Sequence, residues 1–119
     1  MKYLYIAGPY AGLHHDYRSY FEIDRNIQRA TEAAALLAAA GVGFFNPHGH
    51  SAHFETIVPS ASKEYWYELD INFMKACDAI LMLPNWEKST GSLEEKRLME
   101  AWGKPVFYDL EEAVEWAQS

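Results

Sequence analysis

Cysteine, basic residues and long hydrophobic runs are all scarce in this sequence of 119 residues. The single cysteine, Cys77, cannot form an internal disulfide, so no covalent bridge is expected to stabilise the fold. The Ala-rich run around Leu36 stops at Gly41, well short of the roughly 20 apolar residues that a membrane span needs. No positively charged, then apolar leader precedes the first apolar segment. We therefore expect a cytoplasmic protein with no membrane partner.

The shortage of basic residues makes the charge balance one-sided. Ten Lys and Arg residues stand against seventeen Asp and Glu residues, a formal net charge of −7. Because that charge repels a phosphate polymer at long range, it argues against a nucleic acid polymer as partner, although a single nucleotide is still an acceptable ligand. Apolar residues, in contrast, are plentiful at 50% of the chain, enough for one compact domain over residues 1–119.

Short apolar runs alternate with amphipathic segments along the chain. The patterns predict strands at 2–7, 42–45, 78–83 and 105–108, and helices at 21–41, 63–76, 91–102 and 110–117. This alternation predicts an α/β fold, a three-layer sandwich with a mainly parallel sheet of four or five strands, flavodoxin-like or Rossmann-like. Ligands of such folds bind at the carboxyl ends of the strands, so the loops beginning near Gly8, Asn46 and Pro84 are the candidate site.

Glu95 follows the loop between the third predicted strand and the third predicted helix. In a structural interpretation, Ser92 is the N-cap of that helix and Glu95 completes a capping box three residues later. In a functional one, the amide dipoles of the first helical turn keep Glu95 ionised, as a nucleophile requires. Glu95 shares a helix face with Leu98 and Met99, which places it on the buried side, and the two interpretations stay evenly balanced.

Asp70 interrupts the apolar face of the predicted helix at 63–76. A buried aspartate there either bonds to a nearby amide or hydroxyl group or acts as a proton donor. An apolar surrounding raises the pKa of a carboxyl group, and a second carboxylate raises it further, so Asp70 would stay protonated beside an ionised Glu95. Two carboxyl groups with different protonation states suit glycosidic bond cleavage.

The loop after the first predicted strand is a weak phosphate signal. Its sequence from Gly8 to Gly12 lacks both the lysine of a P-loop and the spacing of a dinucleotide fingerprint. It does bring Tyr5 and Tyr10 to the end of the strand. The residues His14, His15 and Arg18 follow, as solvated side chains or as anion contacts.

A second loop, from residue 46 to 62, carries three histidines. His48, His50 and His53 fall within six residues, so a metal site is one interpretation, because imidazole is a good ligand for zinc and similar ions. Their spacing does not match a helical HExxH pattern, however. A loop that faces solvent or contacts a substrate is therefore favoured over a metal centre.

Together, several of these segments resemble the nucleoside 2-deoxyribosyltransferase superfamily. The resemblance rests on YIAGPY at 5–10, Asp70 eight residues before DAIL at 78–81, STGSLEE at 89–95 and GKPV at 103–106. It is strongest to a small bacterial and phage branch with the signature found at 84–91, and it extends to the 2′-deoxynucleoside 5′-monophosphate N-glycosidases. The likeness covers nearly the whole chain, and Gly91 followed four residues later by Glu95 is its most specific part.

The resemblance implies catalytic roles for Glu95, Asp70 and Tyr5. Glu95 would attack the anomeric carbon of a deoxyribosyl group and form a covalent glycosyl-enzyme. Asp70 would bind the sugar or handle the proton given to the departing base, and Tyr5 would position the nucleophile. Ser89 falls where the transferases carry an aspartate for the 5′-hydroxyl and where the N-glycosidases carry a serine for a 5′-phosphate. The further substrate-binding residues that we expect are Gly8, Tyr10, His48 and Gly91.

The first hypothesis is therefore cleavage or transfer of the N-glycosidic bond of a nucleoside or its 5′-monophosphate. Hydrolysis is expected over transfer, because the segment that ends at Ser119 has no evident counterpart of the C-terminal residue that a neighbouring transferase subunit contributes. No cofactor or metal is needed, and a homo-oligomer, dimer or tetramer, is implied. The alternatives are a non-catalytic nucleotide-binding or sensor module of the same fold and, last, a metal-dependent hydrolase that uses the histidine loop.

Overall fold

The computed structural model describes residues 1–119 and is built around a parallel sheet of four strands. The strands are β1 (Tyr3–Ala7), β2 (Gly43–Phe45), β3 (Ala79–Met82) and β4 (Val106–Phe107). They lie in the order β2-β1-β3-β4, and every neighbouring pair is parallel. The predicted α/β sandwich with a parallel sheet is thus confirmed, with four strands.

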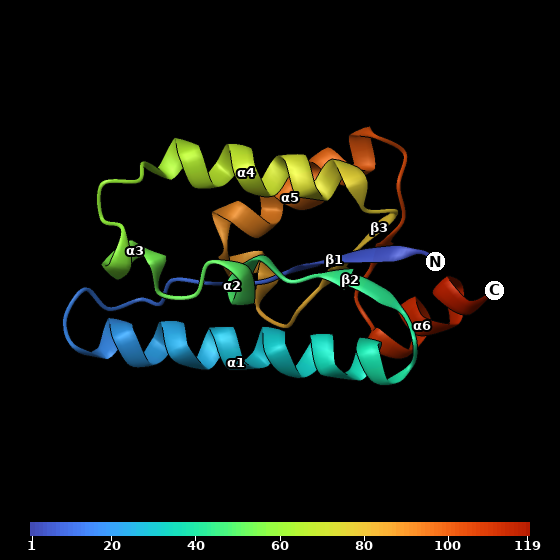
Figure 1. Ribbon diagram of the computed structural model, residues 1–119, viewed down its shortest axis with the longest axis horizontal. Helices are drawn as coiled ribbons and strands as arrows, with labels where there is room; N and C mark the ends of the chain where they lie inside the picture. The colour runs from blue at the N-terminus through green and yellow to red at the C-terminus, as the bar shows by residue number, and fades with distance from the viewer.

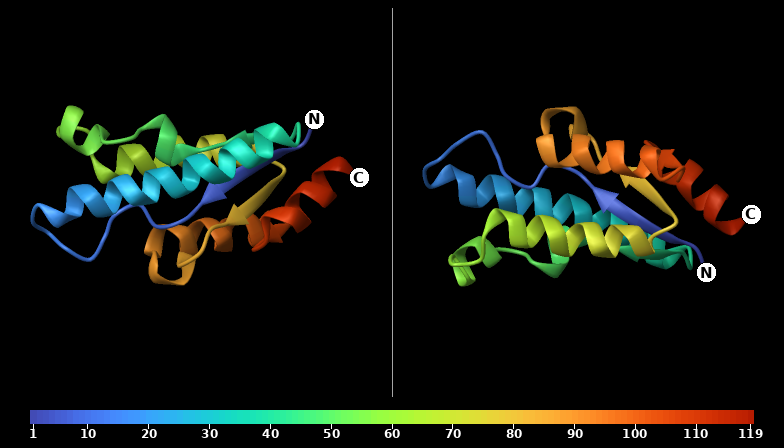
Figure 2. Two further views of the ribbon diagram at one scale, coloured as in Figure 1. Left: turned by 90° about the horizontal axis from the view of Figure 1, so that it is seen from below. Right: turned by 90° about the horizontal axis from the view of Figure 1, so that it is seen from above.

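Helices cover both faces of this sheet (Figure 1). The longer helices are α1 (Arg18–Ala39), α4 (Lys63–Ala76), α5 (Thr90–Ala101) and α6 (Leu110–Gln118). Helices α1 and α6 lie on one face and α4 and α5 on the other, which gives the three layers seen again from two further sides in Figure 2. No helix is both long and apolar enough to cross a membrane.

The alternation of side chains along β1 divides the core in two. Leu4 and Ile6 point to the face covered by α1 and α6, where they pack with Leu37 and Ala113. Tyr5 and Ala7, one residue out of phase, point to the opposite face, where α4 and α5 contribute Met74 and Met99. Because side chains of a strand alternate between the two faces, the register of β1 fixes Tyr5 under α4 and α5.

Helix α1 begins three residues earlier than the apolar spacing predicts. The Asp16 carboxylate accepts a hydrogen bond from the Arg18 N–H at 2.9 Å, and the Asp16 carbonyl accepts one from the Ser19 N–H. These local bonds satisfy the first amides of the helix, which a hydrophobic pattern does not reveal. At its other end the helix gives way to Gly41, whose positive φ of 73° suits a residue without Cβ.

The segment predicted as an irregular loop, 46–62, contains two short helices. Helix α2 (Pro47–His50) starts after Asn46, whose side chain accepts a hydrogen bond from the Gly49 N–H, and proline at its first position fits that start. Helix α3 (Phe54–Ile57) follows, after His53 in a left-handed conformation. Helix α3, the loop after β1 and the first turns of α1 and α4 project beyond the carboxyl ends of the strands (Figure 1).

Candidate active site

A cavity of about 410 Å³ opens at the carboxyl ends of the central strands β1 and β3. At this point the connection that follows β1 and the connection that follows β3 run toward opposite edges of the sheet. Ligands of such folds usually bind there. Its size is in the range of small-molecule sites. The cavity is lined by Gly8, Tyr10, Ala11, Pro47, His48, Ser51, Phe54, Glu55, Lys63, Trp66, Tyr67, Asp70, Ile71, Ser89, Thr90, Gly91, Ser92 and Glu95. Seven of the eight expected site residues are in this set.

The eighth expected residue, Tyr5, lies directly behind Glu95. Its hydroxyl donates a hydrogen bond to Glu95 Oε2 at 2.5 Å, across 90 residues of sequence. Burial and the nearby Glu95 carboxylate raise the pKa of Tyr5 well above its usual value, so the phenol stays protonated and acts as a donor. The second oxygen, Glu95 Oε1, has no hydrogen-bond partner in the protein. One carboxylate oxygen is therefore held in place while the other is free to react.

The capping interpretation of Glu95 is wrong. Helix α5 starts at Thr90, and its N-cap is Ser89, whose hydroxyl oxygen accepts a hydrogen bond from the Ser92 N–H at 3.2 Å. Glu95 is consequently in the second turn of the helix, where its side chain cannot take part in a capping box with Ser89. The 3₁₀ turn η1 (Trp86–Lys88) just before α5 allows this earlier start.

The expectation that the helix dipole keeps Glu95 ionised is wrong for the same reason. Burial raises the pKa of Glu95 to about 7, the Asp70 charge adds to that rise, and the Tyr5 hydrogen bond opposes it. Asp70 behaves as expected in direction, since burial raises its pKa to about 6, while the nearby His50 acts in the opposite sense. Both groups thus titrate close to neutral pH, as general acids and bases do.

Three polar atoms in the wall of the cavity are buried without a hydrogen-bond partner. They are His48 Nδ1, Asp70 Oδ1 and Ser92 Oγ. Buried polar atoms in proteins are nearly always paired, so three orphans around one cavity indicate a ligand that pairs with them. A molecule rich in hydroxyl, amide or phosphate groups would satisfy all three.

His48 and Tyr10 form the wall opposite α5. His48 Nε2 lies 3.1 Å from the Pro9 carbonyl oxygen, and since a carbonyl only accepts, Nε2 carries the proton. Burial lowers the pKa of His48, which keeps the ring neutral and leaves Nδ1 as an acceptor. The Tyr10 ring lies 5.3 Å from the His48 ring, and its hydroxyl donates to Glu55 at 2.8 Å and accepts from the His53 N–H. The Tyr10 ring, rather than its hydroxyl group, is therefore available to a ligand.

The three histidines of the loop do not converge. His48 bonds to the backbone at Pro9, and His50 packs against the stacked rings of Phe45 and Phe73. His53 stacks on Tyr20 at 4.5 Å and lies 3.2 Å from Asp24. No three His, Cys, Asp or Glu side chains in the chain are grouped so as to hold a metal ion. The metal-dependent alternative therefore has no geometric support.

Gly8 has a packing role as well as a place in the cavity wall. A Cβ at this position would lie 3.0 Å from Leu83 Cβ, so the close approach of the two chain segments favours glycine. Gly91 differs, because a Cβ there would meet only Ser89 Oγ, at 3.9 Å. Neighbouring side chains therefore leave room for a larger residue at Gly91, though not at Gly8.

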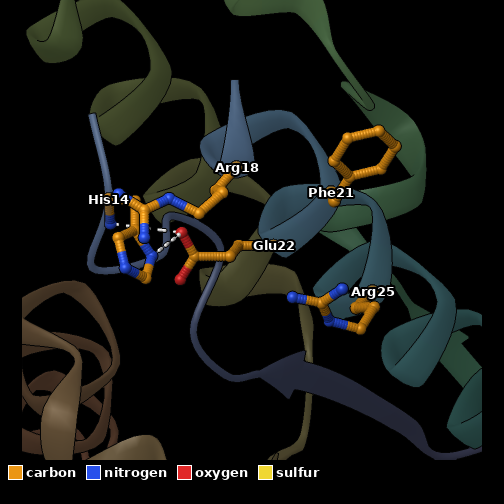
Figure 3. Close-up of a pocket in the computed structure, with 5 residues that line it drawn as sticks. All are labelled: His14, Arg18, Phe21, Glu22 and Arg25. Atoms are coloured by element: carbon orange, nitrogen blue, oxygen red, sulfur yellow. Dashed lines mark hydrogen bonds and ion pairs between the residues drawn. The ribbon is translucent and has the colours of Figure 1, made fainter. Parts of the chain in front are cut away.

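His14 and Arg18, considered as anion contacts, line a separate cavity of about 240 Å³ at the start of α1 (Figure 3). There His14 Nδ1 lies 2.9 Å from the Glu22 carboxylate, and Arg18 pairs with Asp16. Both cationic candidates are thus engaged by acids of their own segment. Neither residue lines the main cavity, nor does His15.

Lys63, Tyr67 and Ser92 are among the residues of the main cavity that the sequence analysis did not assign to the site. Lys63 and Tyr67 precede Asp70 by seven and three residues on α4, so they share its helix face. Lys63 is the sole lysine or arginine in the cavity wall. Helical spacing from Asp70 would have identified both of these residues. Ser92 was considered only as a cap, and no sequence signal reveals that its hydroxyl is unpaired.

Comparison with known protein families identifies the family of this chain. The family described as domain of unknown function (DUF4406) matches residues 2–108, most of the sequence, and the chain belongs to this family. The matched range contains every residue that lines the main cavity. No curated protein matches the sequence.

Proposed function

We propose that the protein is an N-glycosidase of the nucleoside 2-deoxyribosyltransferase-like superfamily. Its substrate is a 2′-deoxynucleoside 5′-monophosphate, and its reaction passes through a covalent glycosyl-enzyme on Glu95. The observation that carries this proposal is the Tyr5–Glu95 hydrogen bond in the wall of a cavity that Asp70 also lines. A buried carboxylate held at one oxygen and free at the other has the arrangement of a nucleophile.

The carboxyl pair shares a proton near neutral pH, and the division of roles depends on which of the two groups holds it. The pKa values of Asp70 and Glu95, about 6 and about 7, mean that the pair holds close to one proton between these pH values. Because the pKa of Glu95 is the higher of the two even with the Tyr5 hydrogen bond, this proton lies mostly on Glu95 in the ligand-free protein. The reactive form is the smaller fraction in which Asp70 holds the proton and Glu95 is ionised, and this fraction is largest between about pH 6 and about pH 7.

The reaction follows from these two states. Glu95 Oε1 forms a bond to the anomeric carbon as the N-glycosidic bond breaks, and the bonding electrons leave with the base, which takes the proton of Asp70. The Asp70 carboxylate then removes a proton from water, whose oxygen attacks the same carbon and releases Glu95. The products are the free base and deoxyribose 5-phosphate.

An anionic substrate fits the charges around the cavity. Ser89 caps α5 with its oxygen lone pair and keeps its own proton for donation to a ligand. The start of α5 carries backbone N–H groups and the positive end of the helix dipole, which together favour a phosphate group. Lys63 adds a positive charge to the same cavity wall.

The test is base release from the common 2′-deoxynucleosides and their 5′-monophosphates, followed by chromatography. We expect the wild type to release free base from the monophosphates and Glu95→Gln to lower the rate by at least about a thousandfold. Glu94→Gln is the matched control, because the neighbouring Glu94 is paired with Arg97 on the outer face of α5 and should retain activity.

Other outcomes would replace the proposal. Exchange of the base with an added second base would identify a transferase. Tight nucleotide binding without any product would identify the non-catalytic binding or sensor module. Equal activity of Glu95→Gln and the wild type would remove the covalent mechanism.

Assembly into a homo-oligomer, dimer or tetramer, is part of the proposal. Its support is a set of large aromatic side chains that are exposed on the single chain, among them Tyr3, Phe44 and Phe73 around the edge strand β2. Apolar side chains left exposed at the edge of a sheet are available for contact with a second copy of the chain. Light scattering of the purified protein would show a mass of at least twice 13.6 kDa, and a monomer would contradict this part of the proposal.

A further inference from the structure

The outer face of helix α1 carries two arginines without an acidic partner. Arg25 and Arg29 are both exposed, and neither takes part in an ion pair of the chain. The Arg29 guanidinium donates one hydrogen bond, of 3.4 Å, to Asn26 Oδ1. The chain as a whole is acidic, with a formal net charge of −7. Two unpaired cations one helical turn apart are therefore a local exception to the charge of this protein.

The acidic residues of the same helix are engaged by other groups. Glu22 accepts hydrogen bonds from two backbone N–H groups of the loop before α1, at 2.9 and 3.1 Å. Asp24 Oδ1 lies 3.2 Å from His53 Nε2, and Glu32 accepts a hydrogen bond from the Gln28 amide at 3.5 Å. Because these carboxylates have other partners, the two arginines are free to pair with carboxylates of a second molecule.

Phe21 adds an apolar contact to the same face, one turn before Arg25. Its ring is 56% exposed and, with Arg25, lines the hollow of about 240 Å³ at the start of α1 (Figure 3). Cavities that enclose a whole small molecule measure roughly 300–1,000 Å³, so this hollow fits a single side chain better. The other cations beside it, His14 and Arg18, lie against acids of their own segment. We call Phe21, Arg25 and Arg29 the α1 stripe.

The spacing of the α1 stripe matches that of an extended peptide. Its three residues follow one another at intervals of four, which corresponds to about 6 Å per step along a helix axis. In an extended segment, alternate side chains point to the same side and lie about 6.6–6.8 Å apart. Three alternate side chains of such a segment therefore reach Phe21, Arg25 and Arg29 in turn. Arginine and aromatic residues are also the kinds of side chain that contribute most to binding at protein interfaces.

We propose that the α1 stripe is a docking surface for an extended acidic segment of another protein. The segment presents an apolar side chain to Phe21 and, two and four residues further along the segment, carboxylates to Arg25 and Arg29. None of these three residues lines the main cavity, so the inference is independent of the proposed function. A nucleic acid is disfavoured as the occupant, because the net charge of −7 repels a phosphate polymer far more than a segment with two carboxylates.

Fluorescence anisotropy with labelled peptides tests the inference and needs no turnover. The probe carries the sequence Leu-Ser-Glu-Ser-Glu between flanking Gly and Ser residues, and the two reference peptides replace both Glu by Gln or both by Lys. We expect the wild type to bind the Glu peptide at least about tenfold more tightly than the Gln peptide and to leave the Lys peptide unbound. Added salt should weaken the binding, because the charges that meet are exposed.

Variants of the α1 stripe separate docking from a structural role. Arg25→Glu should weaken binding of the Glu peptide by about tenfold or more and should make the protein bind the Lys peptide, a gain that loss of structure would not produce. Phe21→Ala should weaken binding of both the Glu and the Gln peptide. Arg97→Gln is the matched control, because this arginine is paired with Glu94 on α5 and the affinity should stay unchanged.

Four results would overturn the inference. The first two are no binding of the Glu peptide by the wild type and equal affinity of Arg25→Glu and the wild type for that peptide. The third is tighter binding of a single-stranded oligodeoxynucleotide than of the Glu peptide, which would identify a nucleic-acid surface. The fourth is a dimer in light scattering that Arg25→Glu dissociates, since the occupant of the α1 stripe would then be a second copy of this chain.

Discussion

At the scale of the residue, the hydrogen bond between Tyr5 and Glu95 orients the Glu95 carboxyl group and opposes the rise in its pKa. Burial raises the pKa of Glu95, and the Tyr5 hydrogen bond opposes that rise. The two effects leave Glu95 close to the point where small changes of environment decide its protonation. The proposed nucleophile is active only when ionised and the proposed acid, Asp70, only when protonated, so the rate of base release should pass through a maximum between about pH 6 and about pH 7.

Tyr5→Phe tests this balance directly. Loss of the hydroxyl removes the interaction that favours the carboxylate, so the pKa of Glu95 rises further, and the alkaline limb of the pH profile, which follows the higher pKa of the pair, moves to higher pH. Loss of an oriented hydrogen bond to a charged group also lowers the rate at neutral pH by about 10- to 100-fold. An unshifted profile with a lower rate would mean that Tyr5 contributes packing only.

At the scale of the element, helix α5 has a capped N-terminus and carries the proposed nucleophile on the face that lines the cavity. Ser89 closes the helix by accepting from the Ser92 N–H, and Glu95 follows on the inner side, two turns before the helix ends at Ala101. The cap sets where the helix begins and so which residues face the cavity. The sequence analysis placed this start one residue further on, at Gly91, and the candidate cap three residues further on, at Ser92, because the pattern of Ser92 followed by Glu95 resembles a capping box.

Ser89→Ala should therefore destabilise the protein. Loss of an N-cap hydroxyl costs about 1 kcal/mol, and for a chain of this size the Tm should fall by about 3–6 °C. Differential scanning calorimetry measures this change. Ser92→Ala, which removes a buried hydroxyl without a partner, should instead raise the Tm, so the two serines are distinguished by the direction of their Tm shifts. An unchanged Tm would show that Ser89 is not the cap in solution.

At the scale of the whole molecule, the buried carboxyl pair couples folding to pH. In the unfolded chain both groups have pKa values of roughly 4, whereas burial raises them in the fold to about 6 and about 7. The folded state thus binds protons more tightly than the unfolded state between these limits. The stability that the pair contributes is fully present near pH 4 and is lost as the pH rises through the folded values.

Glu95→Gln should remove much of this pH dependence. Its neutral side chain stays uncharged at every pH, so at pH 8 the variant should be more stable than the wild type, by an amount on the order of 2–3 kcal/mol, and the difference should shrink toward pH 5. Urea unfolding at several pH values measures it, with Glu94→Gln as control. A variant less stable than the wild type at pH 8 would contradict the raised pKa of Glu95.

The sequence alone was sufficient for much of the fold and for predicting seven of the residues that line the main cavity. The apolar run of β1, the alternation of strands with amphipathic helices and the turn after Gly8 are local patterns, and local patterns reflect the periods of strands and helices directly. Parallel order then places Gly8, Asn46 and Pro84 at one edge of the sheet. The interruption of an apolar face by Asp70 is likewise visible along a single helix.

Only the tertiary structure determined the features of the site that depend on residues distant in the sequence. The protonation of Glu95 depends on Tyr5 and Asp70, which are 90 and 25 residues away, and on burial that only the assembled layers create. The divergence of His48, His50 and His53 follows from three separate packing environments. The unpaired hydroxyl of Ser92 is an absence of contact, which a pattern of residues cannot encode, because satisfaction of a polar atom is a property of the space around it.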